Sequence, residues 1–375
     1  MIYLDYCATT PIIPEVMDSY NKVCKEYYGN PNSMHMMGIK SRELMNSATK
    51  QIASILNIKE SEIVYTSGST ESNNIALIGA ALANKNKGNR IIVSKLEHES
   101  IYGICKYLEE NGFIIDYVNS TSEGIIDFED LKNKVREDTI LVSVCAVNSE
   151  MGIRQPLKTI KQIIKKNNPN CLFHSDMTQA IGKCPINMMD VDLASMSSHK
   201  IYAPKGMGIL YKSSNVKIKP LMYGSNNEFR PGTPNLPGIV SFSKAIRLAF
   251  NDLNKKEDKI SSLNKRIVSH LVKYPKIMIN KTNYSISNIL NISLMDIKPE
   301  TFIHALEKHD VYVASNTACS SGKISNAVLG IYGDKTRALT TIRISLSYLT
   351  TYDEIDRFLK IFDEVYTKLQ ELNND

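Results

Sequence analysis

The first candidate for chemistry is a lysine that follows an apolar stretch. Lys200 stands in the segment "SSHKIYAPKGMGILY", directly after "VDLASM", whose apolar and small side chains predict a buried strand. In a parallel α/β sheet, ligands bind at the carboxyl ends of the strands. A lysine that leaves a buried strand at that end is a candidate to meet a bound cofactor, with Ser197 and His199 beside it.

A second segment has the composition of a phosphate site. In "YTSGSTESNN", an apolar run ends, a glycine permits a turn, and Ser69 and Thr70 precede a helical pattern. Hydroxyl groups and the free N–H groups of a helix N-terminus bind phosphate well. The spacing is not that of the G-x-x-x-x-G-K-[ST] loop, which argues against a nucleoside triphosphate. Taken alone, the segment also fits an ordinary capped helix.

Two further polar residues follow predicted strands. His98 lies in "LEHES" after the run "RIIVSK", and Asp176 lies in "FHSDMTQ". Because side chains alternate along a strand, His174 and Asp176 share one face of the second run. Taken singly, His98 fits a structural histidine and Asp176 fits a helix N-cap. An acid at a strand end is also a recurrent partner for a positively charged ring nitrogen.

The chain alternates strand and helix patterns, which predicts βαβ units and a largely parallel sheet covered on both faces. The predicted strands are "EIVYTS", "RIIVSK", "TILVSVCAV", "CLFHSD", "DLASMSS" and "GMGILYK". Residues 213–238 are rich in proline and glycine and predict a long loop. A charged helical stretch over 239–272 follows and is expected to link two domains. A last helix begins with a capping box of Thr351 and Glu354.

Composition excludes several classes of protein. The 375 residues carry a net charge of +6, but the lysines form no basic run, which argues against nucleic-acid binding. No apolar run approaches the roughly 20 residues that span a bilayer. The start "MIYLDYCATT" lacks the features of a signal peptide, so we expect a cytoplasmic protein. The seven cysteines show no C-x-x-C and no zinc spacing, and we expect no metal.

Together, the four polar segments favour one cofactor. A phosphate cradle, an acid, a histidine and a lysine are all expected at strand ends of one sheet. Pyridoxal phosphate requires this set, since it needs a phosphate anchor, a partner for its ring nitrogen, a stacking group and a lysine for covalent attachment. The ring then accepts electrons from the α-carbon of an amino-acid substrate.

The chain resembles the cysteine desulfurases, in the class V aminotransferase group of fold-type I pyridoxal-phosphate enzymes. The motifs that carry the resemblance span nearly the whole chain in the family's order: "YLDYCATTP", "GNPNSMH", "TSGSTESNN", "EHES", "VNSEMG", "HSDMTQAIGK", "SSHKIYAPKGMGILY", "RPGTPN", "TACSS" and "TIRISLSYLTTYDEID". The fold implied is α/β, with a mostly parallel seven-stranded sheet in a large domain and a smaller α+β domain. We place the large domain at residues 14–254 and the small domain at 1–13 with 255–375.

The resemblance implies a role for each matched position. Lys200 matches the lysine that binds the cofactor, His98 the histidine that stacks on its ring and assists proton transfer, and Arg343 the arginine that binds the substrate carboxylate. Gln179 matches the donor to the ring oxygen, and Thr233 a residue lent to the neighbouring subunit's phosphate, which implies a homodimer. The cofactor-binding set implied is Ser69, Thr70, His98, Asn148, Ser149, Asp176, Gln179, Ser197, His199, Lys200 and Thr233.

Cys319 decides between reactions within this group. It lies in "SNTACSSGK", where small polar neighbours suggest an exposed loop in which a thiol can react. In the family, the matching cysteine takes sulfur from L-cysteine, leaving L-alanine and a protein persulfide. The sulfur then passes to an acceptor, either an iron–sulfur scaffold protein or a tRNA-thiolating enzyme. The alternatives are a selenocysteine lyase, another class V aminotransferase-like enzyme, or a non-catalytic scaffold of the same fold.

Four departures from the family's pattern affect these expectations. Ser149 replaces a second asparagine, so either Asn148 or Ser149 contacts the cofactor, and Asn148 is also a candidate to bind substrate. The loops around Arg230 and after Cys319 are shorter than usual. Cys7 replaces a smaller or amide residue, which we interpret as a packing substitution.

Overall fold

A computed structural model describes residues 1–224, 229–315 and 324–374 of the chain. Its strands, in chain order, are β1 (Ile2–Tyr3), β2 (Ile63–Thr66), β3 (Arg90–Ser94), β4 (Ile114–Val118), β5 (Thr139–Ser143), β6 (Leu172–Asp176), β7 (Leu193–Ser197), β8 (Gly208–Lys212), β9 (Ile277–Asn280), β10 (Ile289–Leu294), β11 (Val311–Tyr312) and β12 (Thr341–Ser345). Its α-helices are α1 (Pro14–Glu26), α2 (Met36–Leu56), α3 (Ser69–Asn84), α4 (Glu99–Glu110), α5 (Phe128–Lys134), α6 (Leu157–Asn167), α7 (Leu236–Phe250), α8 (Leu253–Leu271), α9 (Pro299–Glu307), α10 (Asn326–Tyr332), α11 (Lys335–Leu339) and α12 (Tyr352–Asn374).

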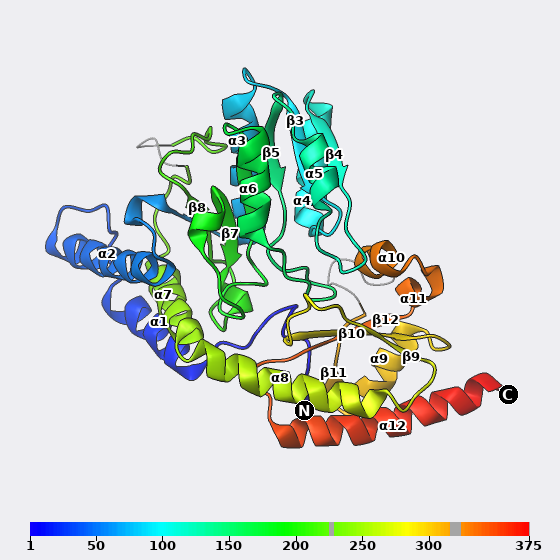
Figure 1. The fold of residues 1–375 in the computed structure, drawn as a ribbon. Coiled ribbons are helices and arrows are strands. Elements are labelled where there is room, and N and C mark those ends of the chain that lie inside the picture. Colours follow the sequence, from blue (N-terminus) through cyan, green and yellow to red (C-terminus); the bar gives the residue numbers. More distant parts are fainter. Residues whose placement is uncertain (225–228, 316–323, 375) are drawn as a thin grey trace.

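The upper lobe of Figure 1 is built on a seven-stranded sheet, with the strand order β2-β8-β7-β6-β5-β3-β4 among the described residues. Strand β8 runs antiparallel to both of its neighbours, and the other paired strands are parallel. The predicted fold class, a mostly parallel sheet within an α/β chain, is confirmed. The parallel arrangement brings the ends of β6 and β7 to one edge of the sheet.

Helices cover both faces of this sheet, which explains why its central strands are almost wholly apolar. Alternate residues of β3 point to opposite sides: Ile91 and Val93 pack with α3 and α4 in one core cluster, and Ile92 packs with α6 and α7 in another. All three side chains are fully buried. The sheet is therefore a rigid, buried platform whose strand ends fix the positions of the residues that follow.

The lower lobe of Figure 1 has its own apolar core, formed around the antiparallel sheet β12-β10-β9 and helices α8, α9 and α12. The first residues of the chain join this core, since β1 pairs with β11, and Ile2 and Leu4 are buried in it. Helix α12 begins with the predicted capping box: the Thr351 backbone N–H donates to the Glu354 carboxylate, and the Glu354 N–H donates to the Thr351 hydroxyl. The division into domains at residue 254 stays a prediction.

The structure differs from the sequence-based expectation in its strands and in one helix. Strands β1, β4, β9, β10 and β11 were not predicted, and β4 forms the edge of the large sheet beside β3. The helical stretch expected over 239–272 is two helices, because the chain turns between α7 and α8 at Asp252, whose φ is 52°. Aspartate tolerates this left-handed conformation better than most residues because its short side chain bonds locally. The break separates the helix of the large core from the helix of the small one.

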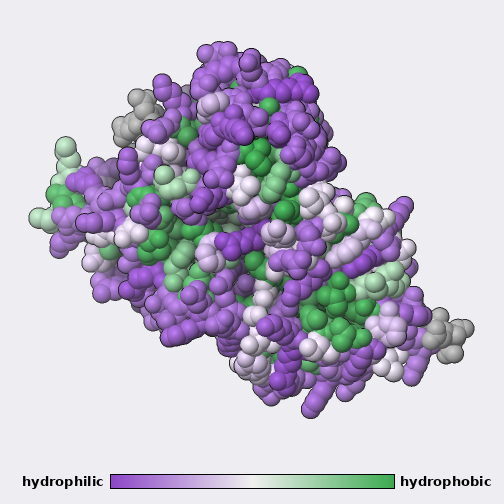
Figure 2. Space-filling model, in the orientation of Figure 1, coloured by the Kyte–Doolittle hydropathy of each residue, from purple (hydrophilic) through white to green (hydrophobic). Residues whose placement is uncertain are grey.

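Surface character agrees with a protein that is solvated over most of its area. Figure 2 shows a mainly hydrophilic face on which apolar side chains gather in separate patches. Exposed apolar side chains at the start of α2 include Met34, Met36 and Met37. Among the residues that the structure describes, no helix combines the length and the apolarity that a membrane span requires.

Candidate active site

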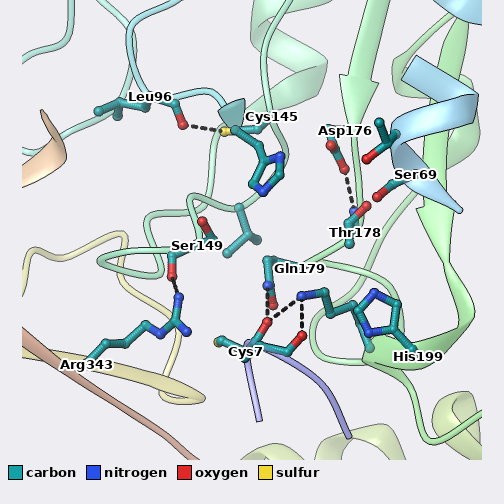
Figure 3. A pocket seen from close by; sticks show the side chains of 15 residues that line it. Cys7, Ser69, Leu96, Cys145, Ser149, Asp176, Thr178, Gln179, His199 and Arg343 are labelled. Atoms are coloured by element: carbon teal, nitrogen blue, oxygen red, sulfur yellow. Dashed lines mark hydrogen bonds between the residues drawn. The ribbon is translucent and has the colours of Figure 1, made fainter. Parts of the chain in front are cut away.

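A cavity of about 260 Å³ lies at the carboxyl ends of β6 and β7, between the two lobes. Figure 3 shows side chains converging on it from both lobes. Nine of the predicted site residues line it, and six further residues complete its wall: Ser69, Thr70, His98, Ser149, Asp176, Gln179, His199, Lys200 and Arg343, with Cys7, Ala8, Leu96, Cys145, Val147 and Thr178. The structure thus brings together side chains that are up to 336 residues apart, from Cys7 to Arg343.

Ser69 and Thr70 form the first turn of α3, directly after β2. The turn between β2 and α3 passes very close to β8. A Cβ atom built on Gly208 of β8 would lie only 2.6 Å from the Cα atom of Gly68 in this turn. This close approach requires glycine at position 208. It places the hydroxyls and the free N–H groups of the helix start at the cavity wall, where an anionic group would be stabilised.

Asp176 is the last residue of β6, and its side chain is held by two donors. The Thr178 backbone N–H donates to Oδ1 over 2.9 Å, and the Asn73 side-chain amide donates to Oδ2 over 2.9 Å. With only 7% of its surface exposed, the carboxylate is fixed in direction. It presents a negative charge at the cavity wall, which suits a cationic ring nitrogen.

Two histidines, His98 and His199, line the cavity. His98 is the N-cap of α4, and its Nδ1 accepts from the Ser100 backbone N–H over 3.2 Å. His199 follows β7 and lies 3.2 Å from the Thr9 hydroxyl through its Nδ1. Burial lowers the pKa of His199 to about 4, and the positive charge of Lys200 adds to this effect. His199 is therefore neutral at physiological pH.

Lys200 ends a short 3-10 turn after β7, and its ammonium reaches the N-terminal segment of the chain. Nζ donates to the backbone carbonyls of Cys7 over 2.6 Å and Ala8 over 2.8 Å. Burial lowers the pKa of Lys200 to about 8, and the nearby positive charge of Lys183 contributes further. A lysine with this pKa is neutral often enough at physiological pH to attack a carbonyl or take up a proton.

The Gln179 side chain links Lys183 to the backbone carbonyl that also accepts from Lys200. Its Nε2 donates to the Cys7 carbonyl over 3.0 Å, and its Oε1 accepts from Lys183. An amide nitrogen carries two hydrogens, so one remains for a ligand. Cys7 is buried and lines the cavity, and its backbone carbonyl accepts from both Gln179 and Lys200. Since any residue has this carbonyl, the interpretation of the cysteine side chain as a packing substitution stays a prediction.

Arg343 lies in β12 of the lower lobe, and only 1% of its surface is exposed. Its guanidinium donates to Asp5 Oδ1 over 2.8 Å and to the Ser149 carbonyl over 2.9 Å. Its buried Nε has no hydrogen-bond partner among the described residues. A buried guanidinium with an unsatisfied donor at a cavity wall suits a carboxylate ligand.

Three of the predicted site residues that the structure describes are not among those that line the cavity. Asn148 is buried and holds its own turn, since its Oδ1 accepts from the Glu150 and Met151 N–H groups and its Nδ2 donates to the Leu96 carbonyl. Of the two alternatives, Ser149 is the one at the wall. Ser197 is 2% exposed behind the cavity, and Thr233 is exposed in the loop before α7. Cys319 lies outside the described residues.

The sequence reasoning did not select two ionisable groups beside the cavity, the partly buried Lys183 and the buried Glu97. Lys183 contacts Gln179, as described above, and Glu97 accepts from the Cys145 backbone N–H. Burial raises the pKa of Glu97 to about 8, with a contribution from the charge of Asp176, so the group is protonated at neutral pH. Both residues lie within quoted motifs, Glu97 in "EHES" and Lys183 in "HSDMTQAIGK", but the surroundings that make them unusual arise only in the folded chain.

Comparison with known proteins assigns this site to a family. The family model described as "Aminotransferase class-V" matches residues 2–358. The chain belongs to the aminotransferase class-V family. Its relatives in this family include a "NifS/IcsS protein homolog" of Lactobacillus delbrueckii subsp. bulgaricus, 36% identical over 100% of this chain and 99% of the relative. A protein of Methanosarcina thermophila named "Cysteine desulfurase IscS" is 36% identical over 99% of this chain and 93% of its own.

Solved structures agree with this assignment. A structure titled "NIFS-LIKE PROTEIN" is similar with a TM-score of 0.93 and 35% identity, covering 98% of this chain and 99% of that one. A second, titled "SspA in complex with cysteine", has a TM-score of 0.81 and 27% identity, covering 94% of this chain and 100% of that one. The resemblance inferred from the motifs is thereby confirmed, and the class V fold matches the fold-type I architecture of these relatives.

Proposed function

We propose that the protein is a pyridoxal-phosphate-dependent cysteine desulfurase. It converts L-cysteine to L-alanine and keeps the sulfur as a persulfide on Cys319. The observation that carries the proposal is the convergence of Lys200, Asp176, His98 and Arg343 on one cavity, in a chain whose full-length relatives are named cysteine desulfurase.

The donor set of the cavity fits pyridoxal phosphate. Ser69 and Thr70 at the start of α3, with Ser197 at the end of β7 and His199 just after it, would hold the phosphate. Asp176 would pair with the ring nitrogen, the remaining Gln179 hydrogen would reach the ring oxygen, and the His98 ring would stack. Lys200 would attach the group covalently. When bound, this cofactor supplies an electron sink for a carbanion at the substrate's α-carbon.

Lys200 is the residue suited to move the proton at that carbon. An ordinary lysine at pH 7.5 is about 0.1% neutral, whereas a pKa of about 8 leaves roughly a quarter of the amines neutral. The pKa of the group thus lies near the working pH, where general base catalysis is most efficient. His199 is a much weaker base than Lys200, because its pKa is only about 4, and it stays neutral at this pH.

Arg343 would fix the substrate by its carboxylate, since its buried Nε donor has no described partner within the chain. Its two contacts to Asp5 and Ser149 hold the guanidinium plane in place. A substrate held at one end by Arg343 and at its amino group near Lys200 would present its side-chain sulfur to the remainder of the cavity.

The overall reaction balances without an external oxidant. The C–S bond of cysteine breaks, an S–S bond forms on the Cys319 thiolate, and the carbon that loses sulfur takes up a proton. Carbon is reduced and sulfur is oxidised by the same two electrons. The persulfide's outer sulfur is then available to a sulfur acceptor, an iron–sulfur scaffold protein or a tRNA-thiolating enzyme.

A homodimer belongs to the same proposal. Thr233 is exposed and does not line the cavity of its own chain, which is consistent with a residue that serves a neighbouring subunit. Its loop borders a second cavity of about 470 Å³, lined by Met45 of α2, Arg230 and Pro234 among others. The exposed methionines at the start of α2 add apolar surface on the same helix.

The test is turnover of L-cysteine by the cofactor-loaded protein with a thiol reductant present. We expect equal amounts of alanine and sulfide from the wild type, and neither product from Cys319→Ala. Comparison of L-cysteine with L-selenocysteine separates a desulfurase from a selenocysteine lyase, and a keto acid product would indicate an aminotransferase. A protein that stays colourless with added cofactor and forms no product would be a scaffold.

A further inference from the structure

A chain of hydrogen bonds runs from Asp176 to His98 through two residues that do not line the cavity. The Asn73 amide nitrogen lies 2.9 Å from Asp176 Oδ2 and 3.1 Å from the Ser100 hydroxyl oxygen. That hydroxyl lies 3.0 Å from His98 Nδ1. The four residues come from β6, α3 and the start of α4, so three separate elements meet in this chain.

The direction of the first bond is fixed by charge. An ionised carboxylate only accepts, so Asn73 must turn its nitrogen, not its oxygen, toward Asp176. Asn73 is 0% exposed, and its Oδ1 has no hydrogen-bond partner among the described residues, so in this orientation only the amide nitrogen bonds. The opposite orientation would place the oxygen against the carboxylate and lose the bond to Asp176.

The direction of the remaining bonds follows from the number of hydrogens. The second hydrogen of the Asn73 amide goes to the Ser100 oxygen, which therefore accepts. A hydroxyl has one hydrogen, and the remaining contact of Ser100 Oγ is to His98 Nδ1. The Ser100 backbone N–H donates to the same ring nitrogen over 3.2 Å. His98 Nδ1 thus receives two donors and must carry a lone pair.

We propose that Asn73 and Ser100 are positioning residues that lock the neutral His98 ring with its hydrogen on Nε2. The partner of one ring nitrogen decides where the hydrogen sits, and here both partners of Nδ1 are donors. The ring consequently offers an N–H donor, and not a basic nitrogen, at the cavity.

This assignment changes what His98 does. A fixed Nε2–H favours a ligand atom that accepts, such as a thiolate sulfur or a carboxylate oxygen. To act as a base at Nε2, the ring would first have to move its hydrogen to Nδ1, where both donors from Ser100 oppose it. The base at the α-carbon is then Lys200. The chemical consequence rests on the proposed function, whereas the position of the hydrogen does not.

The test is nitrogen NMR of the ¹⁵N-histidine-labelled, cofactor-free protein, with the His98 signals assigned by their loss in His98→Gln. We expect Nδ1 to give the signal of an unprotonated ring nitrogen and Nε2 that of an N–H. Asn73→Ala frees the Ser100 hydroxyl to accept, so a fraction with the hydrogen on Nδ1 should appear beside the wild-type tautomer, which the Ser100 backbone N–H still favours. Ser100→Thr retains the hydroxyl and should keep the wild-type spectrum.

The matched control is Asn74→Ala, which removes the neighbouring amide of α3, an exposed group that donates only within its own helix in the contacts described. The inference is overturned if wild-type Nδ1 carries the hydrogen, or if Asn73→Ala leaves the tautomer unchanged. If Asn73→Ala does not fold, the wild-type spectrum alone decides.

With the cofactor bound, Asn73→Ala should lower kcat about tenfold while the cofactor's absorbance persists. This is the lower end of the roughly 10–100-fold loss seen when the hydrogen-bond partner of a metal-binding histidine is removed. An Nε2–H spectrum in a protein that releases no sulfide would refute the proposed function and leave this inference intact.

Discussion

The depressed pKa of Lys200 predicts how stability depends on pH. The group titrates at about 8 in the folded chain and near its ordinary value of 10.5 in the unfolded chain. Between these values the unfolded state binds more protons, so the free energy of unfolding rises with pH. The cost of burying the ammonium is fully present below about pH 8 and is relieved as pH approaches 10.5.

The size of the effect follows from the shift. A difference of about 2.5 pKa units corresponds to roughly 3 kcal/mol in total, of which about 2.5 kcal/mol falls between pH 7 and pH 10. Other groups titrate over this range as well. The difference between the wild type and Lys200→Met isolates the lysine, because the methionine variant has no group to deprotonate there.

The assay is urea unfolding of both cofactor-free proteins at several pH values from 7 to 10. We expect the wild type to gain about 2.5 kcal/mol relative to Lys200→Met over this range. The exposed Lys217→Met variant changes the net charge equally and should run parallel to the wild type. Parallel curves for Lys200→Met as well would show that the amine titrates alike in both states and would refute the reasoning.

Three further predictions concern neighbouring parts of the site. Lys183→Met removes the positive charge that is the second largest cause of the lowered Lys200 pKa, so this pKa should rise toward 10.5. The pH dependence of Lys200 acetylation in the cofactor-free protein measures it, and an unchanged profile would show that Lys183 does not affect Lys200. Arg343→Gln should raise KM for L-cysteine about tenfold or more with cofactor absorbance intact, since a charged hydrogen bond contributes roughly 1.5–3 kcal/mol; an unchanged KM would remove Arg343 from substrate binding. Thr233→Ala should speed cofactor dissociation mildly while size-exclusion chromatography still shows a dimer, and loss of the dimer would mean that Thr233 acts at the interface itself.

The sequence predicted the elements whose signal is local. Six strands were found because each is a short, nearly continuous apolar run, as buried parallel strands are. Strand β4 was missed because it lies at the sheet edge, where Ile114 is 42% exposed and Asp116 pairs with Arg90. The helix break was missed because Asp252 carries no strong turn signal, and its left-handed conformation depends on how α7 and α8 pack against separate cores.

The site followed the same pattern. Lys200, Asp176 and His98 were predicted because they stand directly beyond recognisable strands, and the cavity contains all three. The carbonyl of Cys7, which accepts from Lys200, was not predictable, because every residue has a carbonyl and only folding selects this one. The roles of Asn73 and Ser100 likewise depend on contacts between elements distant in sequence.

The most direct test of the desulfurase proposal uses one equivalent of L-cysteine, the cofactor-loaded protein and no reductant. Alanine is quantified, and the protein is digested and analysed by mass spectrometry. We expect one alanine for each active site and the added mass of one sulfur atom on the peptide that contains Cys319. Alanine without added sulfur on Cys319, or release of pyruvate and ammonia in place of alanine, would contradict the proposal.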